Sequence, residues 1–464
     1  MSFAGLYTGL SGVRAAQTGI DVASHNVANA STPGYTRQRV ELSPSHSFTS
    51  PAGQIGTGVT VEEIGRLRDG FLDDRYRSAV GAEAGATVRA ELLASLEQLA
   101  GEPDHGLSDR FARLWEAAET WANDPADTTA RNQVLAELSS VSDGFRTIAG
   151  SWDALAGDTD DRLVTVADTV GQRLEQLDEL NTEIVGADPA RLGPELLDQR
   201  DMLLDELATL TGAQIRIDED GGAVAEVDGA TLLGPEGAAN VEVDGDTAPA
   251  TITVTSAGDP GDDVPLEAFG GELGALDGFL NATLPELRGE LDELARTFVG
   301  AVNGVNEDGY RLDGSMGQAL LGGDDAGDLA LLGGVDPDAL AAAASPVTGP
   351  HDNGNAEQLA ALRTTPVVGA DEDVDDAATI EGRLADHVTG LAAQVRTERS
   401  NADAARSVHK SAELARAAEH GVSIDEEMVG LVRYQRSLEA ASRVMTTVDE
   451  ALEVLVNRTG IVGR

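Results

Sequence analysis

Apolar residues recur at helical spacing at both ends of the chain. In each end segment they follow one another at intervals of four and three residues, which is the heptad pattern of a coiled coil. We predict that the two ends pair as a coiled coil; the alternative is two unrelated amphipathic helices, each packed on its own domain. A glutamine and a serine in each row would fix the register. The rows are Leu6, Leu10, Val13, Gln17, Ile20, Ser24 and Val27, and Ile424, Met428, Leu431, Gln435, Leu438, Ser442, Met445 and Leu452.

Similar apolar stripes run through the interior of the chain. A helix of about 152–186 and a helix that Pro285 begins both carry one. Sequence breaks interrupt the stripes at 101–106, 123–125 and 186–194, where Gly, Pro, Asp and Asn gather. Long helices with such breaks favour an elongated bundle. The stripes themselves occupy 134–148, 163–184, 287–298 and 380–395.

Two interior regions depart from the helical pattern. Residues 211–258 alternate apolar and polar positions around Asp-Gly turns, which predicts an inserted antiparallel β domain. Residues 307–378 are rich in Gly, Asp and Pro, so we expect a loop-rich, mixed region there. The predicted fold is therefore mainly α with an inserted β domain, elongated and multi-domain. Its parts are a terminal coiled-coil domain (1–35 and 401–464), a helical bundle (36–210 and 265–400) and the β domain (211–264).

The stretch "SHNVANASTPGYTRQ" (24–38) reads as a joint after the first helix. Pro33 disfavours helical backbone before it, and Gly34 permits a tight turn. We predict that Asn29, Pro33, Gly34 and Tyr35 form this joint and redirect the chain. His25, Asn26 and Asn29 would contact adjacent subunits or cap the turn; the alternative is an ordinary helix end.

The distribution of charge separates the two ends of the chain from its interior, as the pattern of apolar residues does. The 464 residues carry a net charge of −49, which argues against nucleic-acid binding. Residues 1–50 have a net charge of +1 and residues 401–464 of −2, which leaves −48 on residues 51–400. Surfaces that pack against other proteins avoid massed like charge, so both ends are expected to be interfaces. Aromatic residues make up only 3%, so the cores are expected to be aliphatic.

Candidate chemistry is sparse. The chain has no cysteine, which excludes disulfides and thiolate sites. No phosphate loop, nucleophile elbow or zinc motif occurs, and the seven histidines are scattered. "IDEDGG" (217–222) is a fragment of a calcium loop and reads better as a hairpin turn, and "DEDVDD" (371–376) as a solvated acidic loop. We predict no enzyme, no metal and no cofactor; no secretory signal peptide or membrane-spanning run is found either.

Both ends resemble the bacterial flagellar rod, hook and hook-associated proteins. The N-terminal signature is "LYTGLSGVRAAQTGIDVASHNVANASTPGYTRQ", and the C-terminal one begins "SIDEEMVGLVRYQRSLEAASRVM". "TPGYTRQRV" and the ending "NRTGIVGR" are more similar to hook-associated members than to rod or hook proteins. Interior stretches such as "PELLDQRDMLLDELATLTG" and "DNGNA" agree, so the resemblance covers nearly the whole chain.

The resemblance implies a structural subunit at the junction of the flagellar hook and filament. Such a subunit is exported through the hollow flagellum without a cleaved signal and assembles as a ring at the hook tip, outside the cell. Its partners would be its own copies, the hook protein, a second junction protein and a cytoplasmic export chaperone. The two rows without Leu6, Ile424 and Leu452 would form the inner layer and subunit interface. The chaperone would bind the face of Ile424, Met428, Leu431, Leu438, Met445 and Leu452.

Two other classes stay open at this point. A hook or distal-rod subunit would use the same inner layer, and only the interior motifs discriminate against it. A helical adhesin or receptor stalk is disfavoured by the near-neutral ends.

Overall fold

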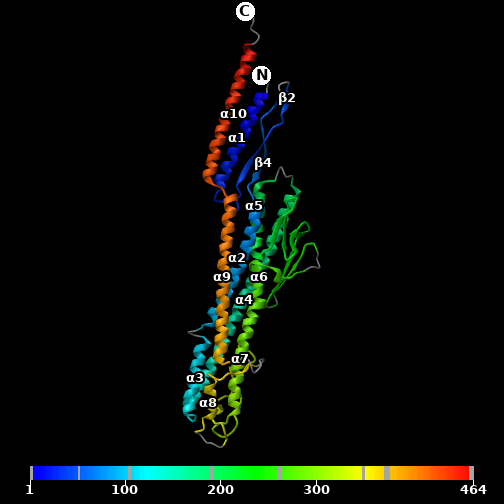
Figure 1. Cartoon of the computed structure of the whole chain (residues 1–464). Coiled ribbons are helices and arrows are strands. Elements are labelled where there is room, and N and C mark those ends of the chain that lie inside the picture. Colours follow the sequence, from blue (N-terminus) through cyan, green and yellow to red (C-terminus); the bar gives the residue numbers. More distant parts are fainter. Residues whose placement is uncertain are drawn as a thin grey trace, which may run out of the picture.

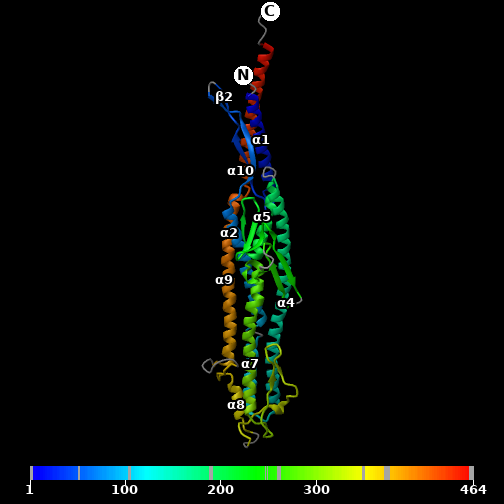
Figure 2. The ribbon, with the colours of Figure 1, turned by 90° about the vertical axis from the view of Figure 1, so that its right-hand side faces the viewer.

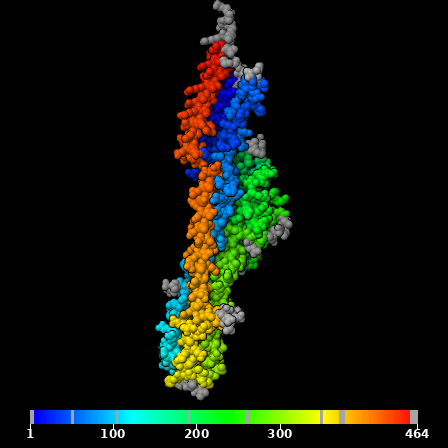
Figure 3. All heavy atoms as spheres, viewed as in Figure 1, coloured from blue at the N-terminus to red at the C-terminus, as the bar shows by residue number. Residues whose placement is uncertain are grey.

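The computed structural model is a long rod whose helices run close to one common axis (Figures 1 and 2). The first and last helices lie side by side at one end of the rod, and a β region bulges from one side of its middle (Figure 3). The structure describes residues 4–50, 53–102, 106–187, 192–245, 247, 249–258, 263–346, 351–369 and 377–458.

One end of the rod is a three-part layer that we call the terminal domain. Helix α1 (Ala4–Asn29) packs against α10 (Ile424–Arg458) along its length. On another side of α1 lies an antiparallel hairpin of β1 (Gln38–Pro44) and β4 (Val59–Arg66). Its outer part is formed by the short strands β2 (Phe48–Ser50) and β3 (Gly53–Ile55). The terminal domain thus places α1 between α10 and the hairpin (Figure 1).

The rest of the rod, which we call the body, is built on long helices. Asp69 caps the first of them by accepting a hydrogen bond from the Phe71 N–H, and Gly101 ends it in the left-handed region at φ +70°. Thr379 caps the last one by accepting from the Gly382 N–H. The first and last of these helices, α2 and α9, pack along each other. The long body helices are α2 (Gly70–Ala100), α3 (Leu107–Asn123), α4 (Thr128–Gly186), α5 (Pro194–Thr211), α7 (Leu284–Asp308) and α9 (Ile380–His420).

The β region follows α5 and is attached to α4. The buried side chain of Asn181 on α4 donates to the Ala223 carbonyl and accepts from its N–H, both at 2.8 Å. One sheet has the order β5-β6-β7-β8 and the next has the order β11-β10-β9. The strands are β5 (Gln214–Ile217), β6 (Ala223–Val227), β7 (Ala230–Gly234), β8 (Gly237–Ala238), β9 (Asn240–Asp244), β10 (Thr251–Thr255) and β11 (Asp263–Val264).

Short elements complete the body. A π-helical turn, η3 (Phe279–Thr283), joins α6 (Gly271–Gly278) to α7. Residues 309–346 and 351–369 cover the far end of the rod with short pieces. The remaining elements are η2 (Leu266–Ala268), β12 (Leu321–Gly322), β13 (Ala330–Leu331), η4 (Pro337–Ala339) and α8 (Gly354–Ala361).

The hydrophobic core belongs to the body. It contains residues from Val88 to Val395 and none from the terminal domain. Its largest fully buried side chains include all three tryptophans, Trp115, Trp121 and Trp152. The rings of Phe111, Phe145 and Phe298 pack around one another at centroid distances of 5.3 to 6.3 Å. Although aromatic residues are few, they are concentrated where the core is thickest, so the expectation of a purely aliphatic core was wrong.

The structure confirms the predicted fold class, with paired terminal helices and an inserted β region. Some details differ. The stripes at 134–148 and 163–184 belong to a single helix, α4, of 59 residues. The boundary predicted at residue 401 falls inside α9, because no Gly or Pro occurs between Gly390 and Gly421. The hairpin of β1 and β4 was missed, because most residues of these two strands are exposed or half-buried.

Two further predictions meet limits of the structure. "DEDVDD" (371–376) and the ending at 459–464 lie outside the described residues. None of the described helices is long and apolar enough to cross a lipid bilayer.

Candidate functional site: the terminal helix pair and its joint

The contact between α1 and α10 is built on small residues. Gly5, Gly9, Gly12 and Gly19 of α1 follow one another at intervals of four, three and seven residues, in line with a heptad, and meet side chains of α10. A Cβ atom at Gly19 would lie 2.5 Å from the Tyr434 ring, and one at Gly9 would lie 2.7 Å from Met445 Cγ. Only glycine permits so close an approach. We call this row the glycine seam.

The glycine seam is shifted by one residue from the row predicted on α1. Leu10, Val13, Ile20 and Val27 are half-buried, and Gln17 and Ser24 are exposed. Neighbouring residues on a helix are about 100° apart, so this row flanks the contact with α10. The physical reason is size: glycines let the helix axes approach, and the larger side chains then line the border of the contact.

The predicted row on α10 is divided between two sides. Leu431, Leu438, Met445 and Leu452 are half-buried, in line with the residues that meet the glycine seam. Ile424, Met428, Gln435 and Ser442 are exposed. The glutamines and serines therefore do not fix the register of the α1–α10 pair within one chain. As contacts to neighbouring copies, the exposed residues stay a prediction.

The hairpin is fastened to α1 at both of its ends. Near the start of the helix, Ser11 Oγ accepts a hydrogen bond from the Val59 N–H at 3.2 Å. Near the end of the helix, the buried side chain of Asn26 donates to the Gln38 carbonyl at 2.9 Å and accepts from its N–H at 3.0 Å. Asn26 therefore pairs with the first residue of β1 much as a neighbouring strand would.

Tyr35 secures the same joint. Its hydroxyl donates to Asn26 Oδ1 at 2.7 Å, and its ring meets His25 edge-on at a centroid distance of 5.5 Å. Burial, followed by the charge of Asp198, raises the pKa of Tyr35. The hydroxyl thus keeps its proton and serves as a donor.

The turn between helix and strand has the predicted features. Asn29 donates to the His25 carbonyl at 3.1 Å and accepts from the Thr32 hydroxyl at 3.1 Å, so it closes the helix end. Pro33 is exposed, and Gly34 adopts φ +74° with Met202 of α5 directly beside it. A Cβ at Gly34 would collide with that side chain. The polar residues of the joint thus bond within the chain.

Below the turn, a buried ion network fixes the hairpin to the body. Arg66 donates to Asp198 at 2.8 Å and to Asp201 at 2.7 Å. Arg68 donates to Asp201 at 2.5 Å and to Asp73 at 2.8 Å. Asp198 and Asp201 belong to α5 and Asp73 to α2, so two residues of the connecting segment tie together three parts of the chain.

Asp201 is the centre of this network. Burial alone would raise the pKa of this carboxyl, but Arg68, Arg200 and Arg66 outweigh burial and lower the pKa to about 2. The neighbouring Arg200 donates to Asp201 at 2.9 Å. A fixed negative charge therefore holds several buried guanidinium groups in place.

The connection between α9 and α10 takes part in the same joint. His420, the last residue of α9, accepts from the Asp69 N–H through Nε2 at 2.8 Å, and its carbonyl accepts from the Arg37 N–H at 3.0 Å. The Arg37 guanidinium donates to Glu426 and Glu427 at the start of α10, both at 2.7 Å. Both passages of the chain between terminal domain and body are thus bonded to each other.

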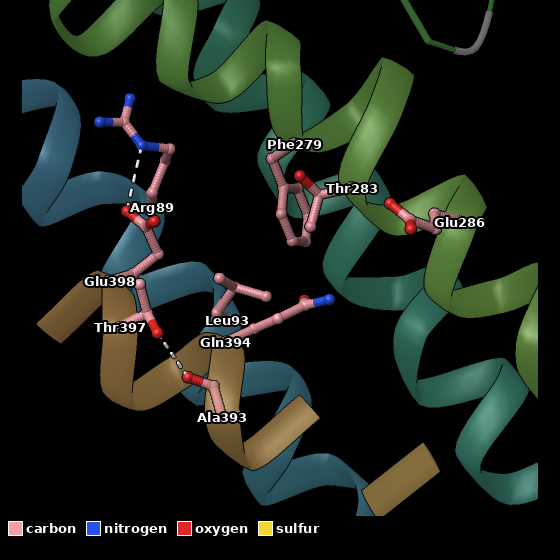
Figure 4. A pocket seen from close by; sticks show the side chains of 9 residues that line it. All are labelled: Arg89, Leu93, Phe279, Thr283, Glu286, Ala393, Gln394, Thr397 and Glu398. Atoms are coloured by element: carbon pink, nitrogen blue, oxygen red, sulfur yellow. Dashed lines mark hydrogen bonds and ion pairs between the residues drawn. The ribbon is translucent and has the colours of Figure 1, made fainter. Parts of the chain in front are cut away.

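A cavity of about 390 Å³ lies in the body, between α2, η3 and α9 (Figure 4). Phe279 and Leu93 line it, and an ion pair of Arg89 and Glu398, 3.4 Å apart, closes one side. Its lining includes no histidine, and the described residues contain no cluster suited to a metal ion. The arrangement offers no nucleophile with an activating base. The cavity therefore suggests no chemistry, and the joint and the terminal helices are the candidate site.

Comparison with protein families matches the chain in three successive parts. Residues 6–36 match a family model described as "Flagella basal body rod protein", and residues 419–458 match "Flagellar basal body rod FlgEFG protein C-terminal". Residues 93–321, almost half of the chain, match "Flagellar hook-associated protein FlgK helical domain". The chain is thus similar to the FlgK family in its interior and to flagellar rod families at both ends.

The similar proteins differ in how much of their own length this chain covers. Flagellar hook-associated protein 1 of Bacillus subtilis is 28% identical over an alignment 525 positions long. The alignment covers 100% of this chain and 99% of that protein. The protein of the same name from Salmonella typhimurium is 28% identical over 332 residues, 67% of this chain and 57% of its own length. A solved structure of the flagellar hook junction protein FlgK from Burkholderia pseudomallei has a TM-score of 0.49 and 24% identity, over 54% of this chain and 46% of that one.

The limits of the two outer matches coincide with the joint. The N-terminal match ends at Thr36, and the C-terminal match begins at Glu419. Sequence reasoning found the turn but missed the ion network beneath it. The available signal was the arginine-rich run from Arg66 to Arg68 together with the acids of "PELLDQRD", which the pattern of apolar residues does not reveal.

Proposed function

We propose that this protein is a structural subunit of the bacterial flagellum that forms the hook–filament junction. One observation carries the proposal: the two ends that match flagellar rod families pair with each other, and the matched FlgK helical domain lies beyond a rigid joint. Such an arrangement suits a subunit that inserts its terminal domain into an axial tube. The role is assembly and requires neither a cofactor nor a catalytic residue.

Charge supports an orientation of the subunit in this assembly. Residues 51–400 carry −48, and the two ends together carry −1. In a ring of copies at the hook tip, the terminal helices would form the inner layer around the channel, and the acidic body would face outward. Like charges then lie farthest apart, where solvent ions screen them. The hook protein and a second junction protein would be the neighbours along the axis.

The route to this position is export through the growing flagellum without a cleaved signal. Before export, a cytoplasmic chaperone would cover the apolar face of α10. Its exposed apolar side chains support this part of the proposal, since Ile424 and Met428 are 53% and 51% exposed. Leu431, Leu438, Met445 and Leu452 would become accessible when α10 separates from α1.

The proposal is tested in a strain that lacks this gene. Electron microscopy is expected to show hooks without filaments, and the wild-type gene is expected to restore filaments. A strain without hooks or without distal rods would instead identify another axial protein. Unchanged filaments would overturn the proposal altogether.

A paired variant tests the assigned face. The change of Leu431→Ala together with Leu438→Ala is expected to abolish filament attachment and to weaken chaperone binding. Its tryptophan fluorescence should match that of the wild type, because all three tryptophans lie in the body. Normal filaments with normal chaperone binding would show that this face has another role.

A further inference from the structure

The terminal domain exposes apolar side chains on two of its sides. On α10, six large apolar residues are at least 44% exposed: Ile424, Met428, Val429, Val432, Val444 and Val454. On the hairpin, Leu42, Phe48, Ile55 and Ile64 are at least 41% exposed. Because α1 lies between α10 and the hairpin (Figures 1 and 3), these two groups belong to opposite flanks of the same domain.

The first surface is a shallow groove along α10. Met428, Val429, Val432, Arg433, Arg436, Ser437 and Ala440 line it, and we call it the α10 groove. Val432 and Arg436 are about half a turn away from Tyr434, which meets the glycine seam. Most of the α10 groove therefore faces away from α1, while Val429 and Arg433 also border a hollow beside Gly19 of α1.

The second surface is the exposed side of the hairpin. Phe48 and Ile55 are direct cross-strand partners, so their side chains lie next to each other. Closer to the joint, the register of β1 and β4 shifts between Glu41 and Leu42, and Glu62 is the extra residue of this β-bulge. The bulge leaves Glu62 and Glu63 exposed on the face of Glu41, whereas Leu42 and Ile64 belong to the other face, with Val40.

The charges of the two surfaces are complementary. Residues 428–447 of α10 contain three arginines and one acid, which is unusual in a chain of net charge −49. Within the described part of the chain, Arg436 and Arg443 have no ion-pair partner, and neither do Glu62 and Glu63. Opposite charges on matching apolar surfaces favour contact and select its register.

The heights along the rod also match. Val59 is bonded to Ser11, and next to it Gly12 packs on Ala441, so these residues mark one level. Glu63 lies four residues from Val59 along β4, roughly 13 Å toward the joint. Arg433 lies eight residues from Ala441 along α10, about 12 Å in the same direction. A neighbour at equal height would thus bring Glu63 opposite Arg433 and Arg436.

We propose that the hairpin of one copy packs into the α10 groove of a second copy. The contact is head-to-tail, because each copy offers its hairpin on one flank and its groove on the other. Repeated contacts of this kind close into a ring or continue as a helix. Glu62 and Glu63 pair with Arg433 and Arg436, and Phe48 and Ile55, which lie farther from the joint, meet Val444 and Val454 on the outer part of α10. This inference rests on the proposed function and names the surfaces that join its subunits.

Disulfide trapping tests the contact, and the absence of native cysteines makes it clean. The full chain with Glu63→Cys and Arg436→Cys replaces the wild-type gene, and isolated flagella are oxidised and separated without reductant. A ladder of multimers of this chain is expected, because every copy links to two neighbours. Each single-cysteine variant is expected to form no ladder.

The matched control moves one cysteine by a single position. Gln435 is also exposed on α10 but lies about 100° away from Arg436. The pair Glu63→Cys with Gln435→Cys is therefore expected to give no ladder. A ladder from the control pair, or none from the pair with Arg436→Cys, would overturn the proposal.

Charge reversal provides a second readout. Glu62→Arg with Glu63→Arg is expected to reduce the number of filaments per cell, and adding Arg433→Glu with Arg436→Glu to the same chain is expected to restore it. Failure of restoration together with an absent ladder refutes the contact, although hooks without filaments in the deletion strain would still support the proposed function. A deletion strain with normal filaments would refute the proposed function itself.

Discussion

The body and the terminal domain use apolar residues in opposite ways. The body buries its largest side chains completely, and three tryptophans and three phenylalanines reach 0–1% exposure. In the terminal domain, α1 and α10 meet through glycines, and among the α10 side chains that the structure describes only Glu427 is buried. The two regions are both helical, yet among the described residues only the body buries aromatic side chains completely, whereas the buried apolar residues of the terminal domain are small or medium-sized, such as Ala16 and Val22.

This difference indicates where each region obtains its stability. Burial of a large apolar side chain contributes about 1.5–3 kcal/mol, and the body makes many such contributions within one chain. The terminal domain leaves comparable side chains exposed on α10 and the hairpin. Its remaining apolar surface is available to other copies, so we infer that assembly completes its packing. A joint of hydrogen bonds and ion pairs connects the two regions.

The largest expected effect concerns the body. Phe298→Ala removes a fully buried ring that packs on Phe111 and Phe145, which should cost about 3–5 kcal/mol of unfolding free energy. Val432→Ala, at a position 44% exposed on α10, should change it by about 0.5 kcal/mol or less. Urea unfolding followed by tryptophan fluorescence measures both. Similar losses for the two variants would abolish the contrast between the regions.

The next effect concerns the ion network at the joint. Asp201→Asn leaves Arg66, Arg68 and Arg200 without their shared carboxylate and should cost about 3 kcal/mol. Asp338→Asn is the control, since Asp338 is 88% exposed. The same urea experiment at pH 7 compares them, and an equally small effect of both changes would mean that the network does not hold the joint.

Acid should remove the contribution of Asp201 to the free energy of unfolding. The pKa of Asp201 is about 2 in the folded chain against an ordinary value of 3.8. Its contribution to the free energy of unfolding is therefore complete at pH values above 3.8. It is lost as the pH falls from there toward 2, by about 2 kcal/mol in total. The difference between wild type and Asp201→Asn should therefore narrow over this pH range. A constant difference would assign the stabilisation to another group.

A smaller effect is expected where the hairpin meets α1. Asn26→Ala leaves the N–H and the carbonyl of Gln38 without their partner, at a cost of about 1–3 kcal/mol. Trypsin should then cleave after Arg37 about tenfold faster or more, with unchanged tryptophan fluorescence. Asn29→Ala is the matched control, because Asn29 bonds only within the turn. Equal cleavage rates would show that Asn26 does not close the joint.

The sequence predicted the elements of this fold better than their faces. Heptad spacing identified the pairing of α1 and α10, because the glycine row and the leucine row beside it have the same spacing of three and four residues. It could not distinguish the glycine row from the leucine row beside it, because apolar pattern ignores how closely two helices approach. The turn at Pro33 and Gly34 was predictable from backbone preferences.

The ion network and the hairpin were beyond this kind of reading. Arg66 and Asp201 are far apart in sequence, and single charges carry no periodic signal that would pair them. The strands of the hairpin owe their position to Asn26 and Ser11 more than to a buried face. Long-range polar contacts of this kind follow only from the folded structure.

The most direct test of the glycine seam is Gly19→Leu in cells with no other copy of the gene. The added side chain would collide with the Tyr434 ring and separate α1 from α10. Gly300→Leu is the control, because Gly300 lies on an exposed face of α7 with open space around it. We predict hooks without filaments for Gly19→Leu, normal filaments for Gly300→Leu, and the same tryptophan unfolding transition for both purified proteins. Normal filament numbers with Gly19→Leu would contradict the claim that this helix pair builds the junction.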